Sequence, residues 1–306
     1  EVVDAIVKVV VTDSFGKQVD AECTVTVQPV PVTGEKLDKE TLNMRTSAET
    51  SLIETVLPAD AHDQTVAWES SDEEIVAAFR PNTKCLFGET ISNPSINVLD
   101  IEKFARIAHS HGVPLIVDNT FATPINCRPF EWGADIVTHS TTKYMDGHGA
   151  GVGGCIVDSG NFDWMAHADK FPGLCTPDAS YHGITYAEKF GQCGAFITKC
   201  TAQLMRDFGS IQSPQNAFYL NLGLESLHVR MARHCENGQA VAEFLAAHPK
   251  VGTVHYCGLP GDPYHEVARK YLPHGSCGVV SFELKGGRPA AEVFMKHLKL
   301  AAIETH

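Results

Sequence analysis

Lys143 closes the segment Ser140-Thr141-Thr142-Lys143, which directly follows a predicted strand at residues 134–139. A lysine amine held at the end of a buried strand can attack a carbonyl carbon and form a Schiff base. The hydroxyls of Ser140 and Thr142, with nearby backbone N–H groups, can bind a phosphate. Each residue also has a purely structural explanation, because most lysines are solvated surface residues and serine or threonine often caps a helix.

Two polar residues elsewhere in the sequence occupy similar positions. Asp118 directly follows the apolar run at 113–117, and Asn93, which precedes a proline, comes after the apolar run at 83–89. Taken singly, an aspartate after a strand is often a turn or N-cap residue, and Asn-Pro commonly forms a turn. With Lys143 the set suits pyridoxal phosphate (PLP), which needs a lysine for its aldehyde, a carboxylate for its ring nitrogen and donors for its phosphate. The spacing by itself leaves both interpretations open.

Strands and helices must alternate to bring these residues together. Residues 100–111 have a helical period of apolar positions, and Gly112 is placed to end that helix. Predicted strands cover the runs at 83–89, 113–117, 134–139 and 155–157. This alternation predicts βαβ units and a parallel sheet, with the first strand buried. Ligands bind beyond the carboxyl ends of such strands, so Asn93, Asp118 and Lys143 are expected to share one crevice.

The remainder of the chain continues the α/β pattern. Long helical patterns cover residues 186–209 and 214–248. A strand at 282–284 and a helix at 290–298 are predicted near the end of the sequence.

Composition excludes some classes of protein. The chain has 306 residues, of which 43% are hydrophobic and 20% charged, with a net charge of −13. This is ordinary globular composition, enough for about two domains. The negative charge argues against a non-specific nucleic-acid binder, and no apolar run reaches the ~18 residues of a membrane span. The sequence has neither an initiator methionine nor a signal-peptide pattern, so we expect it to start inside a longer chain or to have been processed.

The charge is distributed unevenly along the chain. Residues 1–76 hold 16 acidic and 5 basic residues, whereas residues 77–306 hold 21 and 19. The first part also contains only 2 of the 25 glycines and 1 of the 15 histidines. We interpret this as two parts of unrelated origin joined near residue 76. One hypothesis is therefore a chimeric reading frame.

The first part is predicted to be all-β. Alternating runs at 6–12 and 23–27 flank a turn at 13–17, which predicts a hairpin. A proline-containing linker at 29–34 follows, with strand signals at 36–44, 50–57 and 65–69. The stretch from Leu37 to Asp72, which includes Trp68, resembles half of a bacterial Ig-like repeat of the Big-2 type. This implies the end of one repeat at 1–29 and the first half of another at 30–76, as in fragments of surface proteins.

The second part resembles the family of PLP enzymes of Cys/Met metabolism. The motifs that carry the resemblance are Glu89–Pro94, Val117–Pro124 and His139–Tyr144. The stretches Gly160–Trp164 and Tyr181–Gly183 are typical of the family's O-acetylhomoserine sulfhydrylase branch. The resemblance covers about three quarters of the chain.

This resemblance implies a fold and a set of roles. The fold is α/β, of the aspartate-aminotransferase-like fold type I, with a PLP-binding major domain at 77–220 and a truncated α+β C-terminal domain at 221–306. The implied cofactor-binding residues are as follows: Lys143 bears the Schiff base, Asp118 pairs with the pyridine nitrogen, Asn93 lies near the ring hydroxyl, and Ser140 and Thr142 hold the phosphate.

The implied reaction is a γ-replacement that converts O-acetylhomoserine and sulfide or a thiol into homocysteine or methionine and acetate. Lys143 is the implied catalytic acid and base. Cystathionine γ-synthase, cystathionine γ-lyase and methionine γ-lyase activities remain alternatives. The family is usually homotetrameric. Ten cysteines without a disulfide framework favour a cytoplasmic location for this part, whereas the Ig-like segment would suggest the cell surface.

The sequence departs from the family at both ends. Before about residue 77 it lacks the family's Tyr-x-Arg pair, its Gly-Met phosphate turn and the aromatic residue stacked on the ring. It stops at residue 306, before the arginine expected to bind the substrate carboxylate. Because these groups supply affinity and orientation, we expect this polypeptide to have little or no turnover by itself.

Two competing motifs lack the context they need. Gly149, Gly151 and Gly154 match the dinucleotide-binding fingerprint, but the motif leads into a predicted strand instead of opening a helix. The histidines near the site, among them His139 and His148, have no metal-ligand spacing, so no metal is expected.

Overall fold

The computed structural model describes residues 3–12, 18–27 and 72–301. It divides the chain into two compact units, Glu1–Gln64 and Thr65–His306, and each is described by itself.

The first unit contains the predicted hairpin. Strand β1 (Val3–Thr12) pairs antiparallel with β2 (Gln18–Val27), with Thr12 opposite Gln18. The runs of valine and threonine in these strands have high β-propensity. The hairpin turn, the proline-containing linker, the further strands at 36–44, 50–57 and 65–69, and Trp68 lie outside the described residues. The two Ig-like repeats therefore remain a prediction.

The second unit begins, in its described part, with helix α1 (Asp72–Ala78), which spans the boundary predicted at residue 76. Ile75 of this helix is buried.

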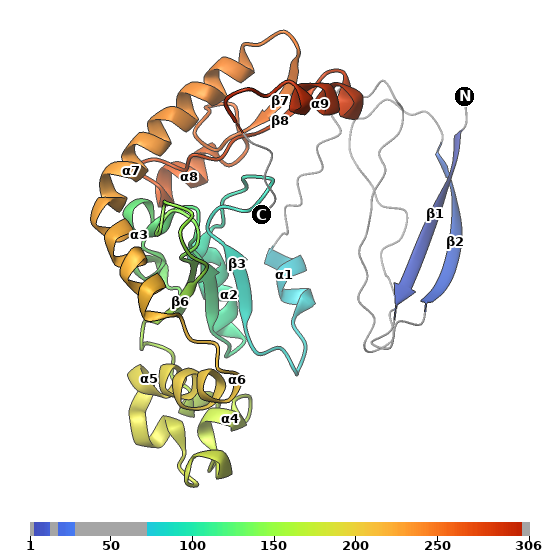
Figure 1. Ribbon diagram of the computed structural model, residues 1–306. Coiled ribbons are helices and arrows are strands. Elements are labelled where there is room, and N and C mark those ends of the chain that lie inside the picture. The colour runs from blue at the N-terminus through green and yellow to red at the C-terminus, as the bar shows by residue number, and fades with distance from the viewer. Residues whose placement is uncertain (1–2, 13–17, 28–71, 302–306) are drawn as a thin grey trace. The chain divides into compact units, whose positions relative to one another are not determined.

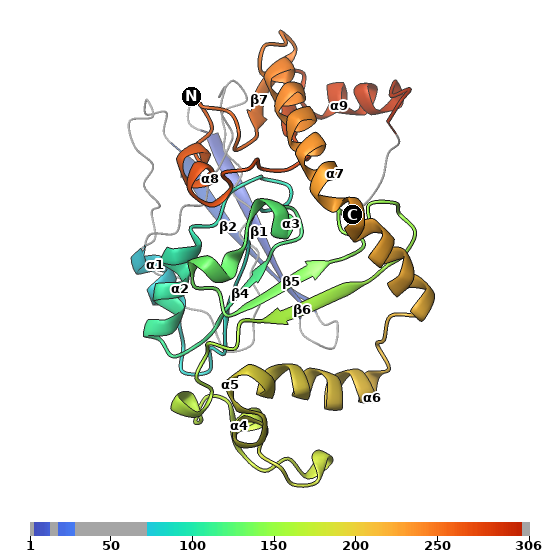
Figure 2. The same ribbon diagram turned by 90° about the vertical axis from the view of Figure 1, so that its left-hand side faces the viewer.

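A four-stranded sheet is the centre of the second unit. Its order is β3 (Leu86–Glu89), β4 (Leu115–Asp118), β5 (Ile136–Ser140) and β6 (Gly154–Asp158). The first three strands are parallel, as predicted, but β6 runs antiparallel to β5, so a wholly parallel sheet is wrong. A parallel return usually passes through a helix, whereas β5 and β6 are joined by a glycine-rich loop in which the structure describes no helix. Figure 2 shows β5 and β6 side by side.

Strand β3 differs from expectation in burial. Within the described residues it pairs with β4 alone, and the side chain of Phe87 is 57% exposed. Leu115 and Val117 of β4 are fully buried instead. The apolar run at 83–89 therefore forms an edge strand of the described sheet, where one side has no neighbouring strand.

Helix α2 (Ile101–Ser110) matches the predicted helix closely. Asp100 caps its first turn by accepting from the backbone N–H of Lys103, and Gly112 follows the helix with a φ of 62°. Ile101 and Ala105 are buried on its inner face. Its apolar side packs into the main core with the two central strands.

Short helical elements follow the sheet strands, and they pack against two separate core clusters. They are α3 (Thr123–Asn126), η1 (Pro129–Trp132), η2 (Met165–His167), α4 (Pro172–Cys175) and η3 (Ala179–Tyr181). The helical pattern predicted at 186–209 forms α5 (Tyr186–Lys199), the π-helical turn η4 (Cys200–Met205) and α6 (Arg206–Phe208). Figure 1 shows α4, α5 and α6 gathered at one end of this unit.

A single long helix, α7 (Pro214–Ala246), begins the C-terminal part, close to the predicted 214–248. The Ser213 hydroxyl caps it by accepting from the N–H of Asn216, and Pro214 occupies its first turn.

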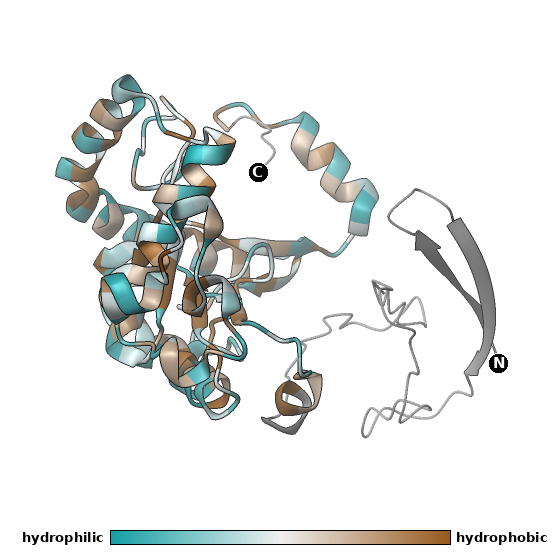
Figure 3. Ribbon diagram, turned by 90° about the horizontal axis from the view of Figure 1, so that it is seen from below, coloured by the Kyte–Doolittle hydropathy of each residue, from teal (hydrophilic) through white to brown (hydrophobic). Residues whose placement is uncertain are grey.

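The remaining elements are β7 (Val251–His255), α8 (His265–Tyr271), β8 (Ser281–Leu284) and α9 (Gly287–Lys296), with β7 antiparallel to β8. Brown and teal segments alternate along the helices in Figure 3, as expected for amphipathic helices. Of the helices described, none is long and apolar enough to span a membrane.

A buried carboxylate connects three elements at the amino end of the sheet. Asp135 precedes β5 and is 3% exposed. It accepts hydrogen bonds from the backbone N–H of Leu115 in β4 and from His109 Nε2 in α2, both at 2.8 Å. The hydrogen bond to Asp135 raises the pKa of His109, against the opposing effect of partial burial. Protonation of His109 therefore strengthens the link between α2 and the sheet.

We expect His109→Gln to lower the melting temperature more at pH 5.5 than at pH 9. The folded-state pKa of His109 lies above its unfolded value, so its contribution is complete below about pH 6.5 and is lost as pH rises through the raised pKa. Since the imidazole is 43% exposed, the effect is about 1 kcal/mol or less. Thermal unfolding followed across this pH range measures it, with the exposed His274→Gln as control. A destabilisation that does not change with pH would contradict the assignment.

Candidate functional site

The predicted site residues meet at the carboxyl edge of the parallel strands. Strand β4 ends at Asp118 and β5 ends at Ser140, and the register places Asp118 opposite Thr138. Lys143 lies three residues beyond β5, in the turn that leaves this strand. Adjacent parallel strands end on the same side of a sheet, so an acid, a lysine and hydroxyl groups share one edge.

The carboxylate of Asp118 is half-buried and held by two neighbours. Its Oδ1 accepts from the backbone N–H of Thr120 at 2.9 Å, and its Oδ2 accepts from the hydroxyl of Thr138 at 3.3 Å. A carboxylate has about four acceptor positions, so this one can accept a further N–H bond from a ligand. The two contacts fix its orientation at the end of the strand.

A buried imidazole lies close to this carboxylate. His139 is 6% exposed, and among the described residues its Nδ1 has no hydrogen-bond partner. Burial lowers the pKa of His139, although the negative charge of Asp118 opposes that shift. His139 is therefore neutral near pH 7 and supplies no competing positive charge to Asp118.

The turn that bears Lys143 is closed by backbone hydrogen bonds. The N–H of Lys143 donates to the carbonyl of Ser140 at 3.4 Å, and the carbonyl of Lys143 accepts from Gly147 at 2.8 Å. The carboxylate of Asp146 then accepts from the N–H groups of His148 and Ala150, at 3.2 and 2.9 Å. These bonds fix the path of the chain on both sides of the half-buried lysine.

The glycine-rich loop returns to the same turn. The hydroxyl of Thr142 donates to the carbonyl of Gly153 at 3.2 Å and accepts from its N–H at 3.0 Å. The same carbonyl accepts from the N–H of Thr141 at 3.0 Å. Nearby, the N–H of Ser140 donates to the hydroxyl of Thr120 at 2.8 Å. The loop that matched the dinucleotide fingerprint thus leads into β6 and helps to hold the lysine turn.

Asn93 lies at the same edge but comes from a different strand. It follows β3, whose last residue, Glu89, is opposite Asp118 in the sheet register. Asn93 is exposed, and its backbone N–H donates to Glu89 Oε2 at 3.1 Å. The structure therefore places Asp118 and Ser140 at the ends of β4 and β5, Thr142 and Lys143 in the turn after β5, and Asn93 four residues beyond β3.

Several neighbours of the site were not singled out by sequence reasoning. Asn119 is 1% exposed; its Oδ1 accepts from the hydroxyl of Thr90 at 2.7 Å, and its amide donates to the carbonyl of Cys127 at 2.9 Å. Asn119 and Thr120 directly follow Asp118, so their position in the motif could have identified them. Arg230 contacts the lysine turn from α7, and no local pattern in the sequence signals this contact.

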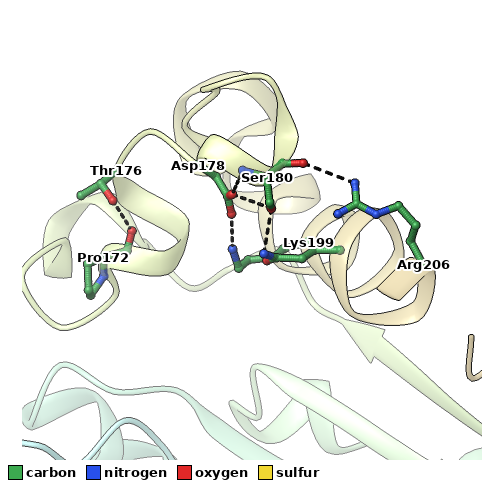
Figure 4. Close-up of polar contacts among 7 residues, drawn as sticks. Pro172, Thr176, Asp178, Ser180, Lys199 and Arg206 are labelled. Atoms are coloured by element: carbon green, nitrogen blue, oxygen red, sulfur yellow. Dashed lines mark hydrogen bonds and ion pairs between the residues drawn. The ribbon is translucent and has the colours of Figure 1, made fainter. Parts of the chain in front are cut away.

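The segment that directly precedes Tyr181–Gly183 forms a compact polar cluster against α5 and α6. Figure 4 shows Asp178 paired with Lys199 at 2.7 Å and Arg206 donating to the carbonyl of Ser180 at 3.4 Å. The hydrogen bond from Lys199 is the main cause that lowers the pKa of Asp178 to about 2. The Lys199 ammonium also lies 4.8 Å from the ring centre of buried Tyr186. These contacts hold the 178–181 segment on the following helices.

Comparisons with known proteins establish the fold class and the family. The fold is that of a PLP-dependent enzyme of fold type I. The chain belongs to the Cys/Met metabolism PLP-dependent enzyme family, whose model matches residues 46–306. This match begins upstream of residue 77, where the sequence predicts the enzyme-like part to begin. The matches give no support to the Ig-like interpretation of residues 1–76.

Two relatives and one solved structure illustrate the similarity. The chain is 45% identical over 230 residues to a homocysteine synthase of Schizosaccharomyces pombe, covering 75% of this chain and 53% of the relative. It is 45% identical over 227 residues to an O-acetyl-L-homoserine sulfhydrylase of Corynebacterium glutamicum, covering 73% and 52%. A crystal structure described as an O-acetylhomoserine (thiol)-lyase from Campylobacter jejuni, containing N'-pyridoxyl-lysine-5'-monophosphate, has a TM-score of 0.72 and 33% identity. That match covers 77% of this chain and 58% of the other. The chain thus spans about half the length of the curated relatives it matches.

We expect Thr142→Val to lower the melting temperature of the chain by about 2–8 °C. The variant loses both hydrogen bonds to Gly153, at about 1–2 kcal/mol in total, and each kcal/mol corresponds to about 2–4 °C for a unit of this size. Thr142→Ser keeps the hydroxyl and serves as the matched control. Equal melting temperatures for the valine and serine variants would show that these bonds do not hold the loop.

Proposed function

We propose that the carboxyl edge formed by β4 and β5 binds PLP, with Lys143 forming the covalent bond to the cofactor. The observation that carries this proposal is the presence of Asp118 and the Lys143 turn at the ends of adjacent parallel strands, in a member of a PLP-dependent family. Asp118 would accept a hydrogen bond from the protonated ring nitrogen. Asn93, which is exposed at the same edge, would lie near the ring hydroxyl.

The donor set fits this cofactor. Asp118 has acceptor positions left after its bonds to Thr120 and Thr138, and the neutral His139 does not compete for its charge. Ser140 and Thr142 would donate to the phosphate. For Thr142 this means exchanging its bond to the Gly153 carbonyl for one to phosphate. The exchange leaves that carbonyl paired, because the N–H of Thr141 also donates to it.

We further propose that the protein acts on O-acetylhomoserine with sulfide or a thiol. The bound cofactor supplies an electron sink for the negative charge that develops on the substrate. Lys143, once displaced by the substrate amine, takes the proton from the substrate Cα and later returns a proton. The Cγ–O bond breaks with loss of acetate, and a C–S bond forms at the same carbon. The names of the relatives favour this reaction over cystathionine γ-synthase, cystathionine γ-lyase or methionine γ-lyase chemistry.

We also propose a cytoplasmic location and a homotetrameric assembly with small-molecule substrates. The cysteines between Cys85 and Cys277 are free thiols, as expected in a reducing compartment. Exposed apolar side chains on and beside α6 and α7, including Phe208, Ile211 and Phe218, offer surface for contact between copies.

Borohydride reduction in the presence of PLP tests the cofactor site. We expect a stable adduct on Lys143 in the wild-type chain, identified by peptide mass, and none on that peptide in Lys143→Ala. Asp118→Asn should weaken PLP binding about tenfold or more, because an amide cannot hold the ring nitrogen protonated. Labelling spread over several surface lysines, or binding unchanged by both variants, would refute the site.

Single-turnover measurements test the reaction, because we expect little or no multiple turnover from this polypeptide by itself and a single turnover detects even slow chemistry. With protein in excess over O-acetylhomoserine, we expect sulfide-dependent homocysteine and acetate in equal amounts, and none with Lys143→Ala. An oxo acid formed without sulfide would indicate a γ-lyase. If the protein forms cystathionine from cysteine in preference to homocysteine from sulfide, its activity is that of a cystathionine γ-synthase.

A further inference from the structure

Helix α7 contacts the turn that bears Lys143 through the side chain of Arg230. Its Nη1 donates to the carbonyl of Tyr144 at 2.7 Å, and its Nη2 donates to the carbonyl of Met145 at 3.3 Å. Its other bonds stay within α7: Nη2 donates to the carbonyl of Gly223 at 2.8 Å, and Nε to the hydroxyl of Ser226 at 3.0 Å. One guanidinium thus joins the two residues that follow the lysine to the long helix.

The carbonyls that Arg230 binds need these donors. Among the described backbone hydrogen bonds outside regular helices and strands, none reaches the carbonyls of Tyr144 or Met145. A carbonyl near the protein interior without a donor is costly, and a guanidinium can satisfy two with bonds of fixed relative direction. Burial lowers the pKa of Arg230, while the nearby charge of Asp146 opposes this. The hydrogen bonds to Tyr144 and Met145 show that the guanidinium is directed at the backbone of the turn.

Close packing of the two backbones supports the same contact. A Cβ added to Gly223 of α7 would lie 2.3 Å from the carbonyl oxygen of Asp146 and 2.6 Å from that of Met145. A Cβ added to Gly147 would lie 2.2 Å from Arg230 Nη1. The helix and the turn therefore touch directly: a side chain at Gly223 would clash with the backbone of the turn, and one at Gly147, whose φ is 68°, would displace the Arg230 guanidinium.

The side chain of Tyr144 extends the connection in another direction. Its hydroxyl accepts from the N–H of Gly278 at 3.0 Å, and its ring centre lies 5.0 Å from that of His234, one turn beyond Arg230. Burial raises the pKa of Tyr144 to about 12, so the phenol stays protonated. The residue next to Lys143 is consequently fixed at both its carbonyl and its hydroxyl.

We propose that Arg230 is a positioning residue for Lys143, holding the turn so that the lysine amine is correctly placed to bond to the cofactor. This inference rests on the proposed function. Arg230 acts through the backbone of residues 144 and 145. Small displacements of a reacting group can lower a rate by large factors, so the loss of Arg230 should affect bond formation more than cofactor binding.

The test compares Arg230→Gln with Arg233→Gln in the 306-residue chain. Arg233 is the matched control because it lies on the same helix, its side chain is 73% exposed, and it pairs with Glu236 at the surface. For each protein, equilibrium binding gives the PLP affinity, and timed borohydride reduction gives the rate at which bound PLP becomes attached to Lys143. The induced circular dichroism of the bound cofactor reports its orientation, and far-ultraviolet circular dichroism reports folding.

We expect Arg230→Gln to slow attachment to Lys143 about tenfold or more and to reduce the induced circular dichroism, with PLP affinity changed less. Arg233→Gln should match the wild type within about twofold. Arg230→Lys keeps the charge but not the fork of donors, so it should recover only part of the rate. A role limited to folding would lower the melting temperature and leave the rate per bound PLP unchanged, which would overturn the proposal.

If Arg230→Gln does not fold, Arg230→Lys decides the matter: a rate at least about threefold below wild type supports the proposal, and a wild-type rate overturns it. The results that would refute the proposed function differ from those that would refute the positioning role. No labelling of Lys143 in the wild-type chain would refute the cofactor site itself. Equal labelling rates in the wild type and in a folded Arg230→Gln would refute only the positioning role.

Discussion

The parallel pairing of β4 with β5 is the interaction on which the site depends. It places Asp118 opposite Thr138, and the hydroxyl of Thr138 then donates to the carboxylate. Because side chains alternate along a strand, a shift of one residue in this register would turn Thr138 away from Asp118 and bring His139 into its place. The buried residues Leu115 and Val117 of β4 and Val137 of β5 oppose such a shift. The core therefore fixes the distance between the acid and the lysine turn.

The lysine turn itself depends on two segments outside it, one nearby in the sequence and one distant. Gly153 closes it from the glycine-rich loop, and Arg230 holds it from α7. Neither contact is a regular secondary-structure hydrogen bond, so these two contacts hold the turn through side chains and loop backbone. The long helix thus has a role beyond packing, because it connects the sheet's carboxyl edge with the C-terminal part of the chain.

Much of this organisation could be predicted from the sequence. The hairpin of β1 and β2, the helix α2, the strands that end at Asp118 and Ser140, and the long α7 follow from local periodicity and turn residues. The antiparallel direction of β6 was missed because strand patterns do not encode direction. The exposure of β3 was missed because burial depends on which strands pair. Arg230 was missed because an arginine on a helix carries no local sign of a contact with residue 144.

The way Arg230 is held has a consequence for how the protein responds to salt. Its bonds go to carbonyl dipoles and a hydroxyl on a half-buried surface, whereas Arg233 and Glu236 form an exposed pair of opposite charges. Exposed charges that lie farther apart than a Debye length, about 8 Å at physiological ionic strength, are largely screened by mobile ions, whereas short, partly buried interactions are screened much less. The connection between α7 and the lysine turn should therefore be less sensitive to ionic strength than an exposed ion pair such as that of Arg233 and Glu236.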